Sequence, residues 1–281
     1  AGDRHGNAFL VGMGIGMAWD PGRRRERDPY TILQGQAFLT SILAAAADRK
    51  TGMNDSFLKA TLGTTLFFFA HASVGDDFKS ALKLAPDTEN GRDIYVVCVG
   101  CHQPEGWGST SGVIPQIAGQ HPRVIIKQLQ HFSKGYRKSP QMSAFANPEV
   151  LGGTRGIADV AAYISALPMT PDPSQGDGAN LERGGALFRT ACGSKCHGQE
   201  GEGNDFRLWP RLQGQHYAYL LRQMKLIRDG QRRFADNLMV RRLGRLSEQD
   251  LEAVADYLSR IEPEKRRVAP PGWTNPDFRE P

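Results

Sequence analysis

Apolar residues recur at helical spacing in four stretches of the chain, and nothing comparable indicates a sheet. These stretches are residues 122–132, 157–167, 216–227 and 251–261. Their apolar side chains return every three or four positions, which places them on one face of a helix. The last stretch follows Ser247, and Asp250 stands three positions after that serine, in the order of a helix-capping sequence. The pattern predicts an all-α fold.

From about residue 84 onward the chain repeats itself. Three pairs of segments match, namely 91–95 with 184–188, 118–121 with 213–216, and 135–137 with 230–232. The last two pairs share an offset of 95 residues. A repeat of this length indicates two copies of one structural unit. We therefore expect two tandem helical domains, at residues 84–168 and 183–262.

Residues between and after the repeats have the composition of connecting segments. Residues 169–182 are rich in Pro, Gly, Asp and Ser, which is typical of an exposed linker. Residues 263–281 form the end of the chain, residues 268–281 include four prolines, and we expect a C-terminal tail that runs over the surface.

The first 80 residues have no counterpart in the repeats, and we treat them as an N-terminal extension of uncertain structure. Within it, residues 53–72 join a polar start, an apolar run and the sequence Ala70-His71-Ala72. This order resembles a secretory signal that ends in A-x-A, and an ordinary buried helix is the alternative. No apolar stretch reaches the roughly eighteen residues of a spanning helix, so only peripheral membrane association is expected.

Composition and charge exclude several classes of protein. Hydrophobic residues make up 40% of the chain and charged residues 23%, which is typical of a soluble globular protein. The formal net charge is +5, and arginines of the N-terminal extension contribute to it. So mild an excess gives no reason to expect nucleic acid as a partner. A solvated surface of mixed charge is expected, with a weakly basic docking face as the alternative.

The four cysteines form two close pairs, and a histidine follows each pair directly. Cys98, Cys101 and His102 have the spacing at which two thiols form thioethers to haem vinyl groups while the histidine binds the iron. A redox dithiol would not need the histidine, and zinc would need four ligands. A disulfide, or one zinc site made from both cysteine pairs, remains a minor alternative.

The second motif departs from the first by one residue. Cys192 and Cys196 enclose three residues instead of two, and His197 follows directly. Two thioethers can still form if the loop bulges outward, and Gly193 with Ser194 would give the backbone that freedom. We therefore expect a second haem here.

Taken together, the two motifs and the repeat make residues 84–262 resemble class I cytochromes c, specifically the two-domain dihaem family of the c4 type. The resemblance implies two small helical bundles, each around one covalently attached haem c. It also implies that a proline carbonyl accepts the proton of each ligand histidine. That role would fall to Pro115 and Pro210, each thirteen residues after its histidine.

In this family the second axial ligand is a methionine that precedes the last helix of each domain. Met142 and Met239 stand in that place, forty and forty-two residues after the two histidines. A thioether ligand favours reduced iron. The histidines His121 and His216 match each other across the repeat but lie in the middle of each domain, so a structural role is expected for them.

An iron with both axial positions filled by protein has no open place for a substrate, so electron transfer is expected rather than bond chemistry. The resemblance implies a periplasmic carrier of a respiratory chain, between a quinol-oxidising complex or dehydrogenase and a terminal oxidase or reductase. Its partners would be redox proteins. One alternative is a cytochrome subunit of a larger complex that docks through residues 1–80. The other is a dihaem enzyme such as a peroxidase or a sulfur-compound dehydrogenase.

Overall fold

The computed structural model describes residues 76–278 of the chain. Most of the expected N-terminal extension, including the signal-like segment 53–72, lies outside the described residues. Within residues 76–278 the secondary structure is helical, with two isolated bridges and no named strand. The expected all-α class is confirmed.

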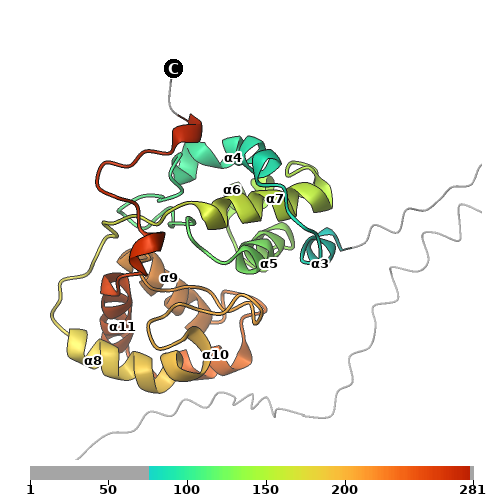
Figure 1. The fold of residues 1–281 in the computed structure, drawn as a ribbon. Helices are drawn as coiled ribbons and strands as arrows, with labels where there is room; N and C mark the ends of the chain where they lie inside the picture. The colour runs from blue at the N-terminus through green and yellow to red at the C-terminus, as the bar shows by residue number, and fades with distance from the viewer. Residues whose placement is uncertain (1–75, 279–281) are drawn as a thin grey trace, which may run out of the picture. The chain divides into compact units, whose positions relative to one another are not determined.

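The first domain is a bundle in which a long helix packs on the last one. Its helices are α3 (Asp77–Ala81), α4 (Thr88–His102), α5 (Pro122–Ser133), α6 (Pro140–Phe145) and α7 (Gly153–Ala166) (Figure 1). Asp87 caps α4 by accepting hydrogen bonds from two backbone amides of its first turn. Tyr95 and Ile157 are completely buried in the shared core, so the packing of α4 on α7 holds the domain together.

The second domain repeats the order from α4 to α7, without a counterpart of α3, and two elements take the place of α4. It consists of α8 (Leu181–Leu187), the π-helix η2 (Phe188–His197), α9 (Tyr217–Arg228), α10 (Asn237–Leu243) and α11 (Glu248–Arg260). Phe188 and Leu251 are completely buried where α8 and η2 meet the last helix. The two tandem cytochrome-like bundles expected from the repeat are therefore present.

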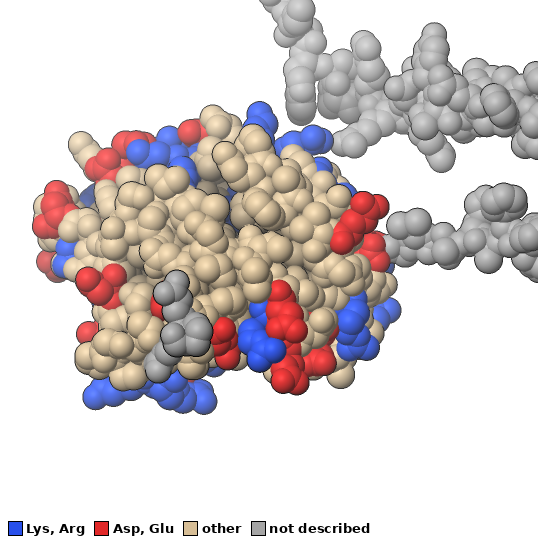
Figure 2. Space-filling view, turned by 90° about the horizontal axis from the view of Figure 1, so that it is seen from above, with Lys and Arg blue, Asp and Glu red and all other residues tan. Residues whose placement is uncertain are grey.

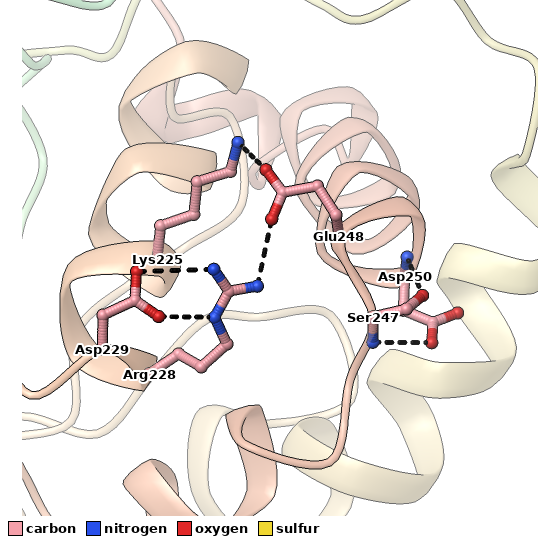
Figure 3. Close-up of polar contacts among 6 residues, drawn as sticks. All are labelled: Lys225, Arg228, Asp229, Ser247, Glu248 and Asp250. Carbon is pink, nitrogen blue, oxygen red and sulfur yellow. Dashed lines mark hydrogen bonds and ion pairs between the residues drawn. The ribbon is translucent and has the colours of Figure 1, made fainter. Parts of the chain in front are cut away.

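Helix α11 begins as the sequence predicts. The hydroxyl of Ser247 accepts the Asp250 amide, and the Asp250 carboxylate accepts the Ser247 amide (Figure 3). Glu248 in the same turn forms ion pairs with Lys225 and Arg228 of α9 (Figure 3). The start of α11 is thus tied both to itself and to α9.

The linker and the tail pack more closely than the sequence suggested. Met169 is 2% exposed, and its backbone bonds to residues on either side of Val268. In the tail, Trp273 packs on Trp107 with ring centroids 5.8 Å apart. Residues 171–180 of the linker are exposed or half-buried, and so are most residues of the tail, so the contacts of Met169 and Trp273 are local anchors of two surface segments.

Glutamines join the two domains through a near-symmetric set of hydrogen bonds. Gln120 donates to the Arg211 carbonyl (3.0 Å) and accepts from its amide (2.9 Å). Gln215 bonds in the same way to Gln116, at 2.7 and 3.1 Å. Gln215 lies 95 residues after Gln120, and Arg211 lies 95 residues after Gln116, so equivalent positions exchange the same bonds and the two domains meet around an approximate two-fold axis.

The two matched histidines also serve this interface. His121 Nε2 lies 2.8 Å from the Glu202 carbonyl, and His216 Nε2 lies 2.8 Å from the Trp107 carbonyl. Each ring thus bonds to the backbone of the other domain, which agrees with the structural role expected for both.

Charge on the face drawn in Figure 2 is mixed. Lys and Arg lie among Asp and Glu around a broad area of uncharged residues. This agrees with the solvated surface of mixed charge that the composition predicts.

Candidate functional site

The first cysteine pair lies in the last turn of α4. Cys98 is partly buried against the core of the first domain, whereas Cys101 is exposed. Burial, with a smaller contribution from Cys101, raises the pKa of the Cys98 thiol to about 12, so it is neutral at pH 7. The helix ends after His102 because Gln103 has a φ of 67°.

His102 is held in one orientation by the backbone. Its side chain is 6% exposed, and its Nδ1 lies 3.0 Å from the Pro115 carbonyl oxygen. A carbonyl can only accept, so Nδ1 carries the proton and Nε2 keeps its lone pair. Burial lowers the pKa of this imidazole. A neutral ring with a fixed tautomer is the form in which histidine binds a metal.

The second motif has the same arrangement in a different helix. Cys192 and Cys196 lie in η2, and burial raises the pKa of the Cys192 thiol to about 11. His197 is 6% exposed, and its Nδ1 lies 3.1 Å from the Pro210 carbonyl oxygen. The structure therefore brings each histidine to the proline that the resemblance assigned to it.

Glycines beneath these prolines escaped the sequence analysis. Gly108 and Gly203 have φ values of 72° and 75°, and their amides donate to the carbonyls of His102 and His197. A Cβ at Gly108 would overlap the carbonyl of Pro115, and one at Gly203 would overlap the backbone of Trp209 and Pro210. Their offset of 95 residues was the signal that could have revealed them.

The two methionines occupy equivalent positions in short helices. Ser139 caps α6 and accepts from the Met142 amide at 3.3 Å, and Asp236 caps α10 and accepts from the Met239 amide at 3.1 Å. Both methionines are therefore the third residue after a cap, and both are partly exposed. Helix α10 packs on η2, which carries His197.

A pair of arginines meets at the domain interface, and sequence reasoning missed it. Arg137 donates to Gln128 (2.9 Å) and Gln223 (3.0 Å), and Arg232 donates to the same glutamines at 2.7 and 3.3 Å. Arg137 also donates to the Tyr219 hydroxyl at 3.0 Å. Burial, then the charge of Arg137, lowers the pKa of Arg232 to about 10. We call Arg137 and Arg232 the interface arginines.

No carboxylate within residues 76–278 bonds to either interface arginine. Nearby His131 is 7% exposed, and its Nδ1 is buried without a hydrogen-bond partner. Burial, followed by the charges of Lys127 and the two arginines, lowers the pKa of His131 to about 4. Positive charge concentrated in a buried place is costly unless an anion balances it.

These residues fit haem c, which forms from a haem with two vinyl groups, an iron and two carboxylates. Each domain offers two thiols, one oriented neutral histidine and one thioether. Both interface arginines lie on the segments that lead to the methionines, where they can face carboxylates. The donor set therefore suits the group that the motifs predict.

Nothing in the described residues favours the zinc or disulfide alternatives. No two of the four cysteines form a disulfide, and within residues 76–278 no three His, Cys, Asp or Glu side chains gather as a metal site. In the same part of the chain, no helix is long and apolar enough to cross a membrane.

Comparison with known proteins gives a consistent result. The cytochrome c family model matches residues 88–168 and again residues 181–262. Cytochrome c4 of Azotobacter vinelandii is 34% identical over 188 residues, which cover 62% of this chain and 89% of that protein. A thiosulfate dehydrogenase electron acceptor of Stutzerimonas stutzeri is 28% identical and matches over 64% of this chain and 90% of its own length. The crystal structure of reduced cytochrome c4 from Pseudomonas stutzeri superposes with a TM-score of 0.56 at 30% identity, over 63% of this chain and all of that one.

Proposed function

Because the chain belongs to the cytochrome c family, within its two-domain c4 group, we propose that it carries electrons in the periplasm between membrane-linked redox enzymes. The family assignment makes it a dihaem electron carrier with one covalently attached haem c in each domain. The donor we propose is a quinol-oxidising complex or a dehydrogenase, and the acceptor is a terminal oxidase or reductase.

Two sets of residues would hold the haems. The cysteines Cys98 and Cys101 in the first domain, and Cys192 and Cys196 in the second, would form the thioethers. His102 with Met142 would bind one iron, and His197 with Met239 would bind the other. When bound, the haem iron supplies one-electron exchange between its ferrous and ferric states.

One observation carries this proposal: a buried histidine whose Nδ1 is held by a proline carbonyl occurs twice, each time directly after a cysteine pair. Pro115 and Pro210 thus orient the two rings and keep the proton on Nδ1, which leaves Nε2 of each ring able to bind iron. With a histidine and a methionine bound to it, each iron would exchange single electrons and would offer no free position to a substrate.

The interface arginines would balance the haem carboxylates. Their guanidinium groups are held by shared glutamines, so each is positioned by both domains. A fixed positive charge beside a carboxylate favours the reduced, less positive iron. We infer that the two haems share one polar environment across the interface.

Intact mass under denaturing conditions, combined with a redox titration followed by absorbance, tests the proposal. We expect the mass of two haems, a methionine-to-iron charge-transfer band in the oxidised protein, and two one-electron transitions. Protein without haem, made in cells that possess a haem-attachment system, would contradict the proposal. Loss of the band in Met142→Ala and Met239→Ala would identify the ligands.

A second candidate follows from the similarity to a thiosulfate dehydrogenase electron acceptor. In this version the electron donor is a dehydrogenase that oxidises a sulfur compound. Stopped-flow mixing with such an enzyme and thiosulfate should reduce both haems. A chain that stays oxidised there, yet is reduced by a quinol-oxidising complex, would favour the first candidate.

Within the periplasm, the proposed location includes peripheral association with the membrane. Fractionation of cells should place the protein in the periplasmic fraction, with a share released from membranes by a salt wash. Protein that remains in the cytoplasmic fraction would contradict the export on which the attachment of haem c depends.

A further inference from the structure

The second haem-attachment segment is longer than the first, although both begin at the same kind of anchor. Gly91 of α4 and Gly184 of α8 each lie against the last helix, where a Cβ would overlap the carbonyl of Asp159 or Ala253. One turn later, Tyr95 and Phe188 are both completely buried. These two rings pack on Tyr163 and Tyr257 of the last helices, with centroids 5.3 and 6.1 Å apart.

Both segments also end at the same kind of anchor. The hydrogen bonds from His102 to Pro115 and from His197 to Pro210 measure 3.0 and 3.1 Å. Between the buried aromatic residue and the histidine, inclusive, the first domain has eight residues and the second has ten. One of the two additional residues precedes Cys192, and the other lies between the cysteines.

A change of helix type absorbs this difference. Residues 95–102 are α-helical, and the seven steps from Tyr95 to His102 turn the chain by about 1.9 turns at 3.6 residues per turn. Residues Phe188–His197 form a π-helix, whose i→i+5 bonding gives about 4.4 residues per turn, so its nine steps turn the chain by about 2.0 turns. Ten π-helical residues thus bring His197 to nearly the same angle as eight α-helical residues bring His102.

We propose that the π-helix Phe188–His197 is a register device, which presents Cys192, Cys196 and His197 to the second haem in the frame of the first domain. Both thioethers then form despite the additional residue between the cysteines. The inference rests on the proposed function and specifies how its second site is built. It replaces the outward loop bulge expected from the sequence with regular helical winding.

The cysteine spacing agrees with this proposal. Three residues of α-helix separate Cys98 from Cys101 by about 0.8 turn. Four residues of π-helix separate Cys192 from Cys196 by about 0.9 turn. Each thiol adds across one vinyl double bond, forming an S–C bond while its hydrogen moves to the terminal vinyl carbon. No oxidant or reductant is consumed in this addition.

Gly193 is the positioning residue of the π-helix. It follows Phe188 by five residues, and a Cβ there would lie 3.0 Å from the Phe188 ring and 3.2 Å from the Gly198 carbonyl oxygen. Gly100, between the cysteines of the first domain, has nothing within 4 Å of the same position. The π-winding therefore brings the backbone of Gly193 onto the ring that anchors the segment.

Alkylation of the wild-type holoprotein is the first test. Iodoacetamide under denaturing conditions should label no cysteine, while the intact mass shows two haems. Two haems together with a labelled Cys192 would overturn the register device and leave the proposed function standing. A mass with only one haem, missing from the second motif, would overturn the second site itself.

Two variants of opposite kind then test the register. Removal of both Thr190 and Lys195 shortens the segment to the length found in the first domain. We expect an α-helix there, two haems, no free thiol and an unchanged methionine-to-iron band. Insertion of one alanine between Thr190 and Ala191 keeps the attachment motif intact but turns His197 by about 80°. We expect two haems and loss of about half of the band.

The deletion variant and the insertion variant together test whether the helical winding controls the position of His197. If the two-residue deletion loses the band as the insertion does, the segment tolerates no change and the register explanation is wrong. If the insertion keeps the full band, the winding does not control the ligands and the proposal is also wrong. Two haems in every variant would leave the carrier function untouched in either case.

Discussion

Single backbone atoms orient the proposed iron ligands. The Pro115 and Pro210 carbonyls hold the histidine rings, and Gly108 and Gly203 allow the chain to pass close beneath those prolines. Both glycines have positive φ, where a side chain is strained, and neither has room for a Cβ. The two glycines therefore allow the loop conformation that places each proline carbonyl against its histidine ring.

Substitution of Gly203 tests this role. Gly203→Ala should displace the Pro210 carbonyl and cost on the order of 2 kcal/mol of stability, through both strain and overlap. We expect a lower Tm and an altered midpoint potential for the second haem alone. Gly272→Ala is the control, because Gly272 also has positive φ but nothing within 4 Å of its Cβ position. If Gly203→Ala and Gly272→Ala lower the Tm equally and neither changes the potential, backbone strain alone explains the effect at Gly203.

A pair of glycines inside the attachment motifs provides a second test. Gly193→Ala should push the Phe188 ring and lower the Tm of the second domain by a few degrees, equivalent to about 1 kcal/mol. Gly100→Ala should be neutral, because its Cβ would point into open space. Thermal unfolding followed at a haem band distinguishes them, and equal losses would argue against close packing at Gly193.

At the scale of elements, helix ends decide where the ligand-bearing helices begin. Ser139 caps α6 and Asp236 caps α10, so the two methionines take the same third position although their distances from the histidines differ by two residues. Ser247 does the same for α11. The capping residue therefore fixes where each helix begins, and with it the helical position that the methionine takes.

Removal of the α11 cap should weaken the second domain. Ser247→Ala deletes the hydroxyl that accepts the Asp250 amide, and the expected cost is about 1 kcal/mol. Ser247→Thr keeps the acceptor and should recover most of that loss. Urea unfolding measures both variants, and an unchanged midpoint for the alanine variant would contradict the importance of the capping box.

The same helix start should make stability depend on pH. Hydrogen bonds and charges from Lys225 and Arg228 lower the pKa of Glu248 from its ordinary 4.5. A carboxyl whose pKa is lower in the folded than in the unfolded chain contributes stability above the unfolded value and loses it as the pH falls. Stability should therefore decrease below about pH 4.5, and Glu248→Gln should flatten that decrease. The effect will be small, because the side chain is exposed.

At the scale of the whole molecule, hydrogen bonds between polar side chains join the two domains at their interface. Each interface arginine bonds to a glutamine of its own domain and to one of the other domain. Gln120 and Gln215 repeat this exchange with backbone groups. A substitution of one of these residues therefore removes hydrogen bonds from both domains.

Arg232→Gln should lower the midpoint potentials of both haems. Loss of a partly buried positive charge stabilises the ferric state, and the expected shift is on the order of tens of millivolts. Arg245→Gln removes an exposed arginine from the same domain and serves as the control. Spectroelectrochemical titration measures the shifts. A change confined to the second haem would argue against the shared environment.

Local patterns in the sequence were enough to predict four of the helices, namely α5, α7, α9 and α11, together with the two domains and the cysteine and histidine motifs. Helical spacing needs only neighbouring residues, and thioether attachment needs only the spacing of thiols next to a histidine. Because the second domain repeats the first, each of these predictions applied to both domains. The family assignment and the two haems follow from this level alone.

Only the tertiary structure decided what lies between the domains and how the second motif is wound. The interface arginines find their glutamine partners up to 104 residues away, and the tail residue Trp273 reaches Trp107 of the first domain. No local pattern encodes such contacts, because burial is a property of the packed chain and not of its neighbours in sequence. The two additional residues were visible in the sequence, but their winding depends on Phe188 and His197, which packing and a hydrogen bond hold in place.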